Sequence, residues 1–420
     1  MTLEIKVEVS REETIRPSSP TPHHLRSSNL SVFDQLTPQV YVPLLLFYPS
    51  NNSDHHSSAS AAERSKLLKR SLSETLSHFY PFAGTIQSND VSICWNDHEA
   101  TFVEARVNYP MSKILEKPDL GIQKQLHPNE LEFLAQSGTG HLLLVQAYFF
   151  ECGGVAIGLN ISHKIIDAYT LCKFINSWAA IALGSANNDH VVPPVEFGAA
   201  ASLFPPLDFL NSPQPSIDFV KENCITRRYV FDASKIAAPK SKAASAAVPN
   251  PTRVEIVSAL IWKCVMEASR SNSDFVRPSV WCEFVNMRKM LPQAPAENLL
   301  GNLVGKGLEE LKVKYGNGIS REDVFQQCIE LSKLVGKVDI DTYCSTSWCR
   351  FPFYEADFGW GKPSWMSNPS TVEIKNMISL VDVSDGIGIE VRLTLKDEDM
   401  AIIESNQEML AYASLNPSVV

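Results

Sequence analysis

The chain has 420 residues, of which 44% are apolar and 20% are charged, a composition typical of a folded globular protein that excludes wholesale disorder. The formal charge of −10 at pH 7 argues against a nucleic-acid partner, because such proteins concentrate positive charge. Single hydrophobic cores stop growing at about 250 to 300 residues, so we expect two domains with a cleft between them.

The beginning of the chain predicts no export. Residues 3–9 alternate apolar and charged side chains, which predicts a strand and lacks the apolar core of a secretion signal. No apolar run is long enough to cross a bilayer. Nine cysteines occur singly, without a CxxC pair, which is typical of a reducing compartment. We therefore expect a cytosolic protein without a membrane partner, and we assume a monomer.

The first half predicts one mixed α/β domain over residues 1–190. Apolar runs and helical periodicity indicate a buried strand at 42–48, a helix at 62–79, and two strands at 142–150 and 155–161. The next stretch is rich in Asn, Pro and Ser and lacks periodicity, so we predict a crossover linker at 191–220.

The second half, residues 221–420, predicts a second domain in which helices and strands again intermix. The predicted elements are a low-complexity surface loop at 235–251, a helix at 252–268, a strand at 279–287, a helix at 321–334, and a hairpin in which Asp385-Gly386 joins 377–383 to 387–395.

His163 and Asp167 form the most informative pair in the chain. His163 continues the parity of the apolar residues in the strand 155–161, so if the strand extends that far the imidazole points to the buried side. A helical stripe begins near Asp167, which puts His163 at a strand-to-helix junction, where functional sites are common. An imidazole at such a junction can act as a base on a substrate.

Three other roles are open to this pair of residues. An isolated HxxxD usually means a core histidine and an acid at a helix start. A metal site needs a third ligand, which the neighbourhood does not offer. A Ser-His-Asp hydrolase needs a GxSxG elbow, which the chain lacks.

The run TSWCRFPFYEADFGWGKP, residues 346–363, is dense in aromatic residues and glycine. For Asp357, Gly359, Trp360 and Gly361 we favour a packed structural corner. Thr346 and Trp348 carry a hydroxyl and an indole N–H that could face a developing oxyanion.

At these residues the chain resembles the plant BAHD acyl-CoA-dependent acyltransferases, defined by HxxxD (here residues 163–167) and DFGWG (here residues 357–361). The resemblance is close to full length and includes LLFYP, HFYPFAG, LGN and SWCR. Within the family, the sequences around both motifs most resemble the vinorine synthase-like acetyltransferases of alkaloid pathways.

The resemblance implies an α/β fold of two chloramphenicol-acetyltransferase-like domains with mixed sheets, separated by a solvent channel. His163 would be the general base midway along the channel, with Thr346 and Trp348 near the thioester. Asp167 would be structural and paired with Arg288, and Asp357 would preserve the channel's shape. No metal or bound cofactor is expected, and acyl-CoA would be the co-substrate.

The expected function is acetyl transfer from acetyl-CoA to a hydroxyl of an alkaloid or terpenoid, with a small-molecule alcohol as acceptor. Transfer to an amine remains an alternative, because the motifs do not separate oxygen from nitrogen acceptors. Hydrolysis of the thioester and a catalytically silent ligand-binding homologue are two further alternatives.

Overall fold

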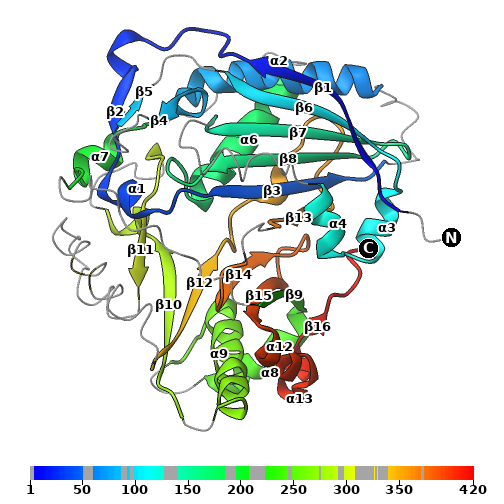
Figure 1. Ribbon diagram of the computed structural model, residues 1–420, viewed down its shortest axis with the longest axis vertical. Coiled ribbons are helices and arrows are strands. Elements are labelled where there is room, and N and C mark those ends of the chain that lie inside the picture. Colours follow the sequence, from blue (N-terminus) through cyan, green and yellow to red (C-terminus); the bar gives the residue numbers. More distant parts are fainter. Residues whose placement is uncertain are drawn as a thin grey trace.

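The computed structural model describes residues 4–50, 60–86, 92–94, 99–126, 141–184, 195–207, 223–244, 248–273, 276–291, 298–307, 326, 329, 339–369 and 373–420. Two mixed sheets lie one above the other along the longest axis of the molecule (Figure 1). A small third sheet joins β2 (Ser27–Asn29), β4 (Thr85–Ile86) and β5 (Ser92–Cys94). The predicted fold class, an α/β protein with mixed sheets, is confirmed.

The first sheet has the strand order β1-β6-β7-β8-β3-β13, in which β6 and β7 run parallel and the other neighbours run antiparallel. Its strands are β1 (Val7–Ile15), β3 (Tyr41–Tyr48), β6 (Ala100–Val107), β7 (Leu143–Phe150), β8 (Val155–Ser162) and β13 (Trp365–Ser367).

Helices cover both faces of this sheet. On one face, α2 (Ala61–His78) and α6 (Ala168–Gly184) enclose a core that includes alternate residues of β3 and β8. The other face packs on α3 (Met111–Glu116) and is adjoined by α4 (Leu120–Gln125). All eight residues of β8 are consequently buried, because a strand covered on both sides has no solvent face.

The second sheet has the order β11-β10-β12-β14-β15-β9-β16 and is also mixed, since β10, β12 and β14 run parallel. Its strands are β9 (Cys224–Phe231), β10 (Ser279–Asn286), β11 (Val304–Gly307), β12 (Asp341–Ser347), β14 (Met377–Asp382), β15 (Ile389–Lys396) and β16 (Ser414–Leu415).

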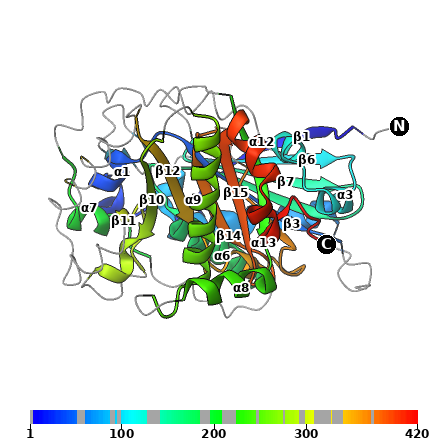
Figure 2. The ribbon, with the colours of Figure 1, turned by 90° about the horizontal axis from the view of Figure 1, so that it is seen from below.

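Figure 2 shows helices across the face of this sheet that points away from the first sheet. They are α8 (Ala233–Ala243), α9 (Arg253–Ser271), α12 (Asp397–Ser405) and α13 (Gln407–Tyr412), and they share one hydrophobic core with the sheet. The opposite face of β15 carries the buried residues Glu390 and Arg392: Glu390 accepts from the indole N–H of Trp365, and Arg392 donates to Gln123 of the first half of the chain.

Most predicted elements are present within one or two residues of their expected bounds. The strand at 42–48 is β3 and the helix at 62–79 is α2, which begins with a capping box between Ser60 and Glu63. The helix predicted from Thr252 is α9, again started by a capping box. The hairpin around Asp385-Gly386 joins β14 to β15, and Gly386 has φ +69°.

The surface loop predicted at 235–251 is wrong over its first part, where the chain forms α8. The segment is rich in alanine, the best helix former, and Ile236 is buried against the second core. Pro239 lies within the helix, and the low complexity of the segment was what favoured a loop. The helix predicted at 321–334 lies outside the described residues, apart from Gln326 and Ile329, which are helical. The described part of the predicted linker contains a short helix, α7 (Ala199–Leu203).

Strand β13 belongs to the second half of the sequence but pairs with β3 of the first sheet. Trp365 stacks on Phe47 with ring centroids 5.2 Å apart. The two halves are therefore joined by a shared sheet, which the boundaries at 190 and 221 did not predict. Among the described helices, none is long and apolar enough to cross a membrane.

Candidate active site

The turn after β8 carries the HxxxD motif. The strand ends at Ser162, so the parity argument that put the His163 ring on the buried side does not hold. His163 instead occupies a turn, its backbone N–H donates to the carbonyl of Val40 at 2.8 Å, and the residue is half-buried. The ring is thus neither sealed in the core nor fully exposed.

The hydrogen bond of the His163 ring fixes its tautomer. Nδ1 lies 2.8 Å from the carbonyl oxygen of Ile166. Because a carbonyl can only accept, Nδ1 carries a proton, and in the neutral ring Nε2 therefore carries the lone pair. Nε2 has no hydrogen-bond partner among the residues that the structure describes. The turn therefore leaves Nε2 available for a substrate.

The carboxylate of Asp167 is held by donors other than His163. Arg288 Nη1 lies 2.6 Å from Oδ2, and both side chains are almost fully buried. The backbone N–H groups of Thr170 and Leu303 donate to Oδ1 and Oδ2 at 2.8 and 3.1 Å. The contact expected between Asp167 and Arg288 is present, and it joins the start of α6 to the end of β10.

Electrostatics keep Asp167 ionised. Burial alone would raise the pKa of this carboxyl, but the charge and hydrogen bonds of Arg288, with the two backbone donors, lower the pKa below its ordinary value. Arg288 is itself held by the carbonyls of Leu299 and Gly301 and lies over the ring of Tyr169, 4.4 Å from its centroid.

Two further residues next to the motif were not predicted from the sequence as site residues. Asn302 Nδ2 donates to the backbone oxygen of His163 at 2.7 Å and to Oδ1 of Asp34 at 2.8 Å. Asp34 is buried and also caps α1 (Val32–Leu36) through Ser31. In the sequence, Asp34 is marked only by its capping pattern with Ser31, and Asn302 only by the LGN segment 300–302. Neither pattern indicates that the two residues are in contact.

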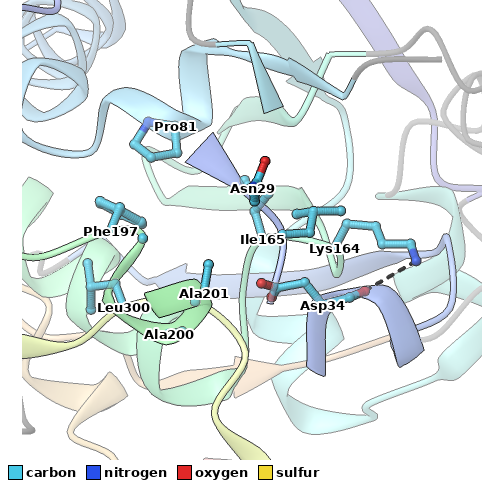
Figure 3. Close-up of a pocket in the computed structure, with 12 residues that line it drawn as sticks. Asn29, Asp34, Pro81, Lys164, Ile165, Phe197, Ala200, Ala201 and Leu300 are labelled. Atoms are coloured by element: carbon cyan, nitrogen blue, oxygen red, sulfur yellow. Dashed lines mark hydrogen bonds between the residues drawn. The ribbon is translucent and has the colours of Figure 1, made fainter. Parts of the chain in front are cut away.

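A small pocket lies beside the turn that carries the HxxxD motif (Figure 3). Lys164 and Ile165 line it from the turn, and Lys164 Nζ donates to the backbone oxygens of Asp34 and Gln35. Most of the other lining is apolar and comes from both halves of the chain: Leu30, Pro81, Phe197, Ala200, Ala201 and Leu300. His163 is not among the lining residues, so this pocket adjoins the turn of the HxxxD motif and does not include the His163 ring.

The predicted donors Thr346 and Trp348 lie at the end of β12 and just beyond it. Thr346 is half-buried and is in register with Ser379 of β14. Trp348 stacks on Phe353 at 5.5 Å and shares the first core with Ile165. Its indole N–H makes no hydrogen bond within the described part of the chain. No hydrogen bond joins either residue to His163 there, so their role stays a prediction.

The DFGWG segment forms a tight corner. Asp357 Oδ1 accepts from the backbone N–H groups of Gly359 and Gly361 at 2.8 and 3.0 Å, and both glycines have φ near +100°. Phe358 is fully buried between Tyr48 and Trp178, and Trp360 stacks on it. These contacts are those of the structural corner proposed from the sequence. No group of three or more potential metal ligands occurs among the described residues.

Comparison with known proteins identifies the family. The profile of the Transferase family matches residues 5–314 and 309–410. The chain is 39% identical to akuammiline synthase 1 of Alstonia scholaris, over 96% of each chain. This chain is a BAHD acyltransferase. This acyltransferase is also 35% identical to a 17,18-epoxy-17-hydroxycur-19-ene N-malonyltransferase of Strychnos nux-vomica, covering 98% of this chain and 91% of the relative. It is 34% identical to stemmadenine O-acetyltransferase of Catharanthus roseus, over 96% and 97%.

The fold of this BAHD acyltransferase agrees with that of a solved relative. The crystal structure of vinorine synthase superposes with a TM-score of 0.82 at 31% identity, covering 99% of this chain and all of the other. The predicted family and its subgroup resemblance are confirmed.

Proposed function

We propose that this enzyme transfers an acetyl group from acetyl-CoA to a hydroxyl group of an alkaloid or terpenoid, with His163 as general base. The observation that carries the proposal is the hydrogen bond from Nδ1 of His163 to the carbonyl of Ile166, which leaves Nε2 as a proton acceptor on a half-buried turn. An imidazole with an unoccupied ring nitrogen can take the proton from an alcohol that is attacking a carbonyl.

In the proposed reaction, Nε2 of His163 removes the acceptor's hydroxyl proton while that oxygen forms a bond to the thioester carbonyl carbon. Thr346 and Trp348 stabilise the oxyanion of the tetrahedral intermediate. The carbon–sulfur bond then breaks, the thiolate of CoA takes the proton from the imidazolium, and the products are an ester and free CoA.

A covalent enzyme intermediate is not required. Cys172 is the cysteine on the helix that follows the motif, and burial raises the pKa of its thiol to about 12. A thiol with such a pKa is protonated at neutral pH and is a poor nucleophile. We therefore assign direct transfer between the two substrates.

The substrate assignment rests on relatives. Stemmadenine O-acetyltransferase supports an alkaloid hydroxyl acceptor and an acetyl donor for this chain. The N-malonyltransferase of Strychnos nux-vomica, at similar identity, supports a second candidate, transfer of an acyl group to nitrogen. Both reactions need the same base, since each removes a proton from the attacking atom.

The test is incubation of the protein with labelled acetyl-CoA, or with malonyl-CoA, and a panel of alkaloid and terpenoid alcohols and amines. Product mass and thiol release are measured together. An acetyl ester formed with stoichiometric thiol supports the proposal, and an amide, whether acetyl or malonyl, supports the second candidate. Thiol release without an acceptor indicates a hydrolase, and ligand retention without thiol release indicates a silent binding protein; either result would overturn the proposal.

A further inference from the structure

One short segment of the second half holds both ends of the HxxxD motif. Within residues 299–303, the side chain of Asn302 donates to the backbone oxygen of His163, and the next backbone N–H, of Leu303, donates to Asp167. The catalytic base therefore sits on a turn whose carbonyl is bonded from the other half of the molecule.

Both hydrogens of the Asn302 side-chain amide are used in hydrogen bonds. Its Nδ2 carries two hydrogens, and it faces two acceptors, the His163 oxygen at 2.7 Å and Asp34 Oδ1 at 2.8 Å. Because both neighbours only accept, the amide nitrogen and not the amide oxygen must point to them. A rotation that loses one bond loses the other as well.

Asp34 holds the Asn302 amide in place through hydrogen bonds. It is buried, and its two carboxylate oxygens accept from four donors, the backbone and side-chain groups of Ser31 and of Asn302. Burial raises the pKa of this carboxyl, and the hydrogen bonds of Ser31 and Asn302 partly offset that shift. Both bonds from Asn302 end on the same oxygen, Oδ1, so Asp34 holds the backbone and the side chain of Asn302 together.

We propose that Asn302, held by Asp34, is a positioning residue for the general base: it fixes the backbone of His163 so that Nε2 lies within reach of the acceptor's proton. The inference rests on the proposed function of His163. Asn302 acts on the imidazole through the backbone of the turn. That backbone carries both the His163 ring and the Ile166 carbonyl, which accepts the hydrogen bond from Nδ1.

The expected effect follows from the sensitivity of proton transfer to geometry. A displacement of about 1 Å at a reacting group can lower the rate about 100-fold. Replacing Asn302 by alanine leaves the His163 carbonyl without its donor, so we expect kcat to fall about 10- to 100-fold. KM for acetyl-CoA should change little, since Asn302 is buried and both of its amide hydrogens are used within the protein.

The experiment compares five proteins: the wild type, Asn302→Ala, Asn302→Asp, the exchange Asp34→Asn/Asn302→Asp, and Asn406→Ala. Asn406 caps α13 on the far side of the second sheet, so this variant loses a side-chain hydrogen bond of similar kind at a remote place. Each protein is assayed for kcat and KM with acetyl-CoA and the panel alcohol that the wild type acetylates fastest, and for its melting temperature.

The exchange variant separates positioning from a purely structural role. In this variant the carboxylate at 302 can accept a hydrogen bond from the amide at 34. The bond between the two side chains is thereby restored, and we expect the melting temperature to recover in part. The carboxylate cannot donate to the His163 carbonyl, so kcat stays low if Asn302 positions the base. Recovery of kcat together with the melting temperature would overturn the inference.

The remaining outcomes are also decisive. A kcat for Asn302→Ala as high as that of Asn406→Ala overturns the positioning role while leaving His163 as the base. If the alanine variant does not fold, the exchange variant, which keeps both side-chain volumes and pairs the carboxylate at 302 with the amide at 34, supplies the comparison with the wild type. If the wild type transfers no acetyl group, the proposed function is wrong, and the inference about Asn302 is overturned together with it.

Discussion

The guanidinium of Arg288 meets the carboxylate of Asp167 at 2.6 Å, although the two residues are 121 positions apart in the sequence. Both side chains are nearly inaccessible to solvent. The pair joins the second half of the chain to Asp167, the last residue of the HxxxD motif. Its geometry predicts how substitutions at Asp167 change the stability of the protein.

Asp167→Ala is expected to destabilise the fold by about 3–5 kcal/mol, because it leaves Arg288 buried without a counter-charge. Chemical denaturation measures the change. Asp167→Ala/Arg288→Met should recover part of the loss, since the unpaired charge is removed as well. A folded Asp167→Ala protein of unchanged stability that has lost turnover would contradict the structural assignment and indicate that Asp167 orients the base.

The same carboxylate predicts how stability depends on pH. The folded-state pKa of Asp167 is lowered from 3.8, so its contribution is complete above about pH 4 and is lost as the pH falls through the lowered pKa. The difference in free energy of unfolding between the wild type and Asp167→Asn should be constant between pH 7 and 5 and shrink below about pH 4. A difference that already shrinks between pH 7 and 5 would contradict a lowered pKa.

His163→Ala should lower kcat by a factor of about 10² to 10⁴, which is the usual contribution of a general base. Stability should change little, because the ring is half-buried and makes one hydrogen bond. Steady-state kinetics and a melting curve on the same preparation separate the two quantities. Full activity in the alanine variant would exclude His163 as the base.

Trp348→Phe tests the predicted oxyanion donor. Phenylalanine can keep the stacking on Phe353 but has no N–H, so we expect kcat to fall about 10²- to 10³-fold with a modest change in stability. Trp178→Phe is the matched control, because the Trp178 indole N–H bonds to Leu68 and Ser71 in the core. That variant should lose stability while kcat of the folded fraction is kept; the reverse pattern would remove Trp348 from the mechanism.

Asp357→Ala should destabilise the DFGWG corner by about 1–3 kcal/mol, since the backbone N–H groups of Gly359 and Gly361 lose their shared acceptor. Asp357→Asn keeps a side-chain oxygen and should be much milder. Thermal unfolding compares the two. If both variants lose activity equally while neither loses stability, the charge of Asp357 serves the reaction and the structural role is wrong.

Local patterns predicted the local elements well. The apolar run of β3 and the capping boxes of α2 and α9 each depend on residues close in sequence, so the sequence contains the whole signal. The loop predicted from low complexity at 235–251 was wrong in its first part, because the alanines of that segment favour the helix α8. His163 was found, but its environment was not, because the end of β8 depends on how the turn is held by Val40 and Asn302.

Long-range contacts at the site were within reach only through family resemblance. Arg288 was named in that way, whereas Asn302 and Asp34 carry no pattern that pairs them across 268 positions. The pairing of β13 with β3 was missed for the same reason, since three residues give no periodicity and their partner lies in the other half.

That pairing also constrains the order of folding during synthesis. Until Trp365–Ser367 have left the ribosome, β3 has β8 on one side and an open row of backbone groups on the other. A nascent chain that ends before this point therefore exposes an apolar strand edge, the kind of surface that recruits chaperones or a second chain. The first sheet is completed only late in translation, and a fragment cut between the halves would carry the same exposed edge permanently.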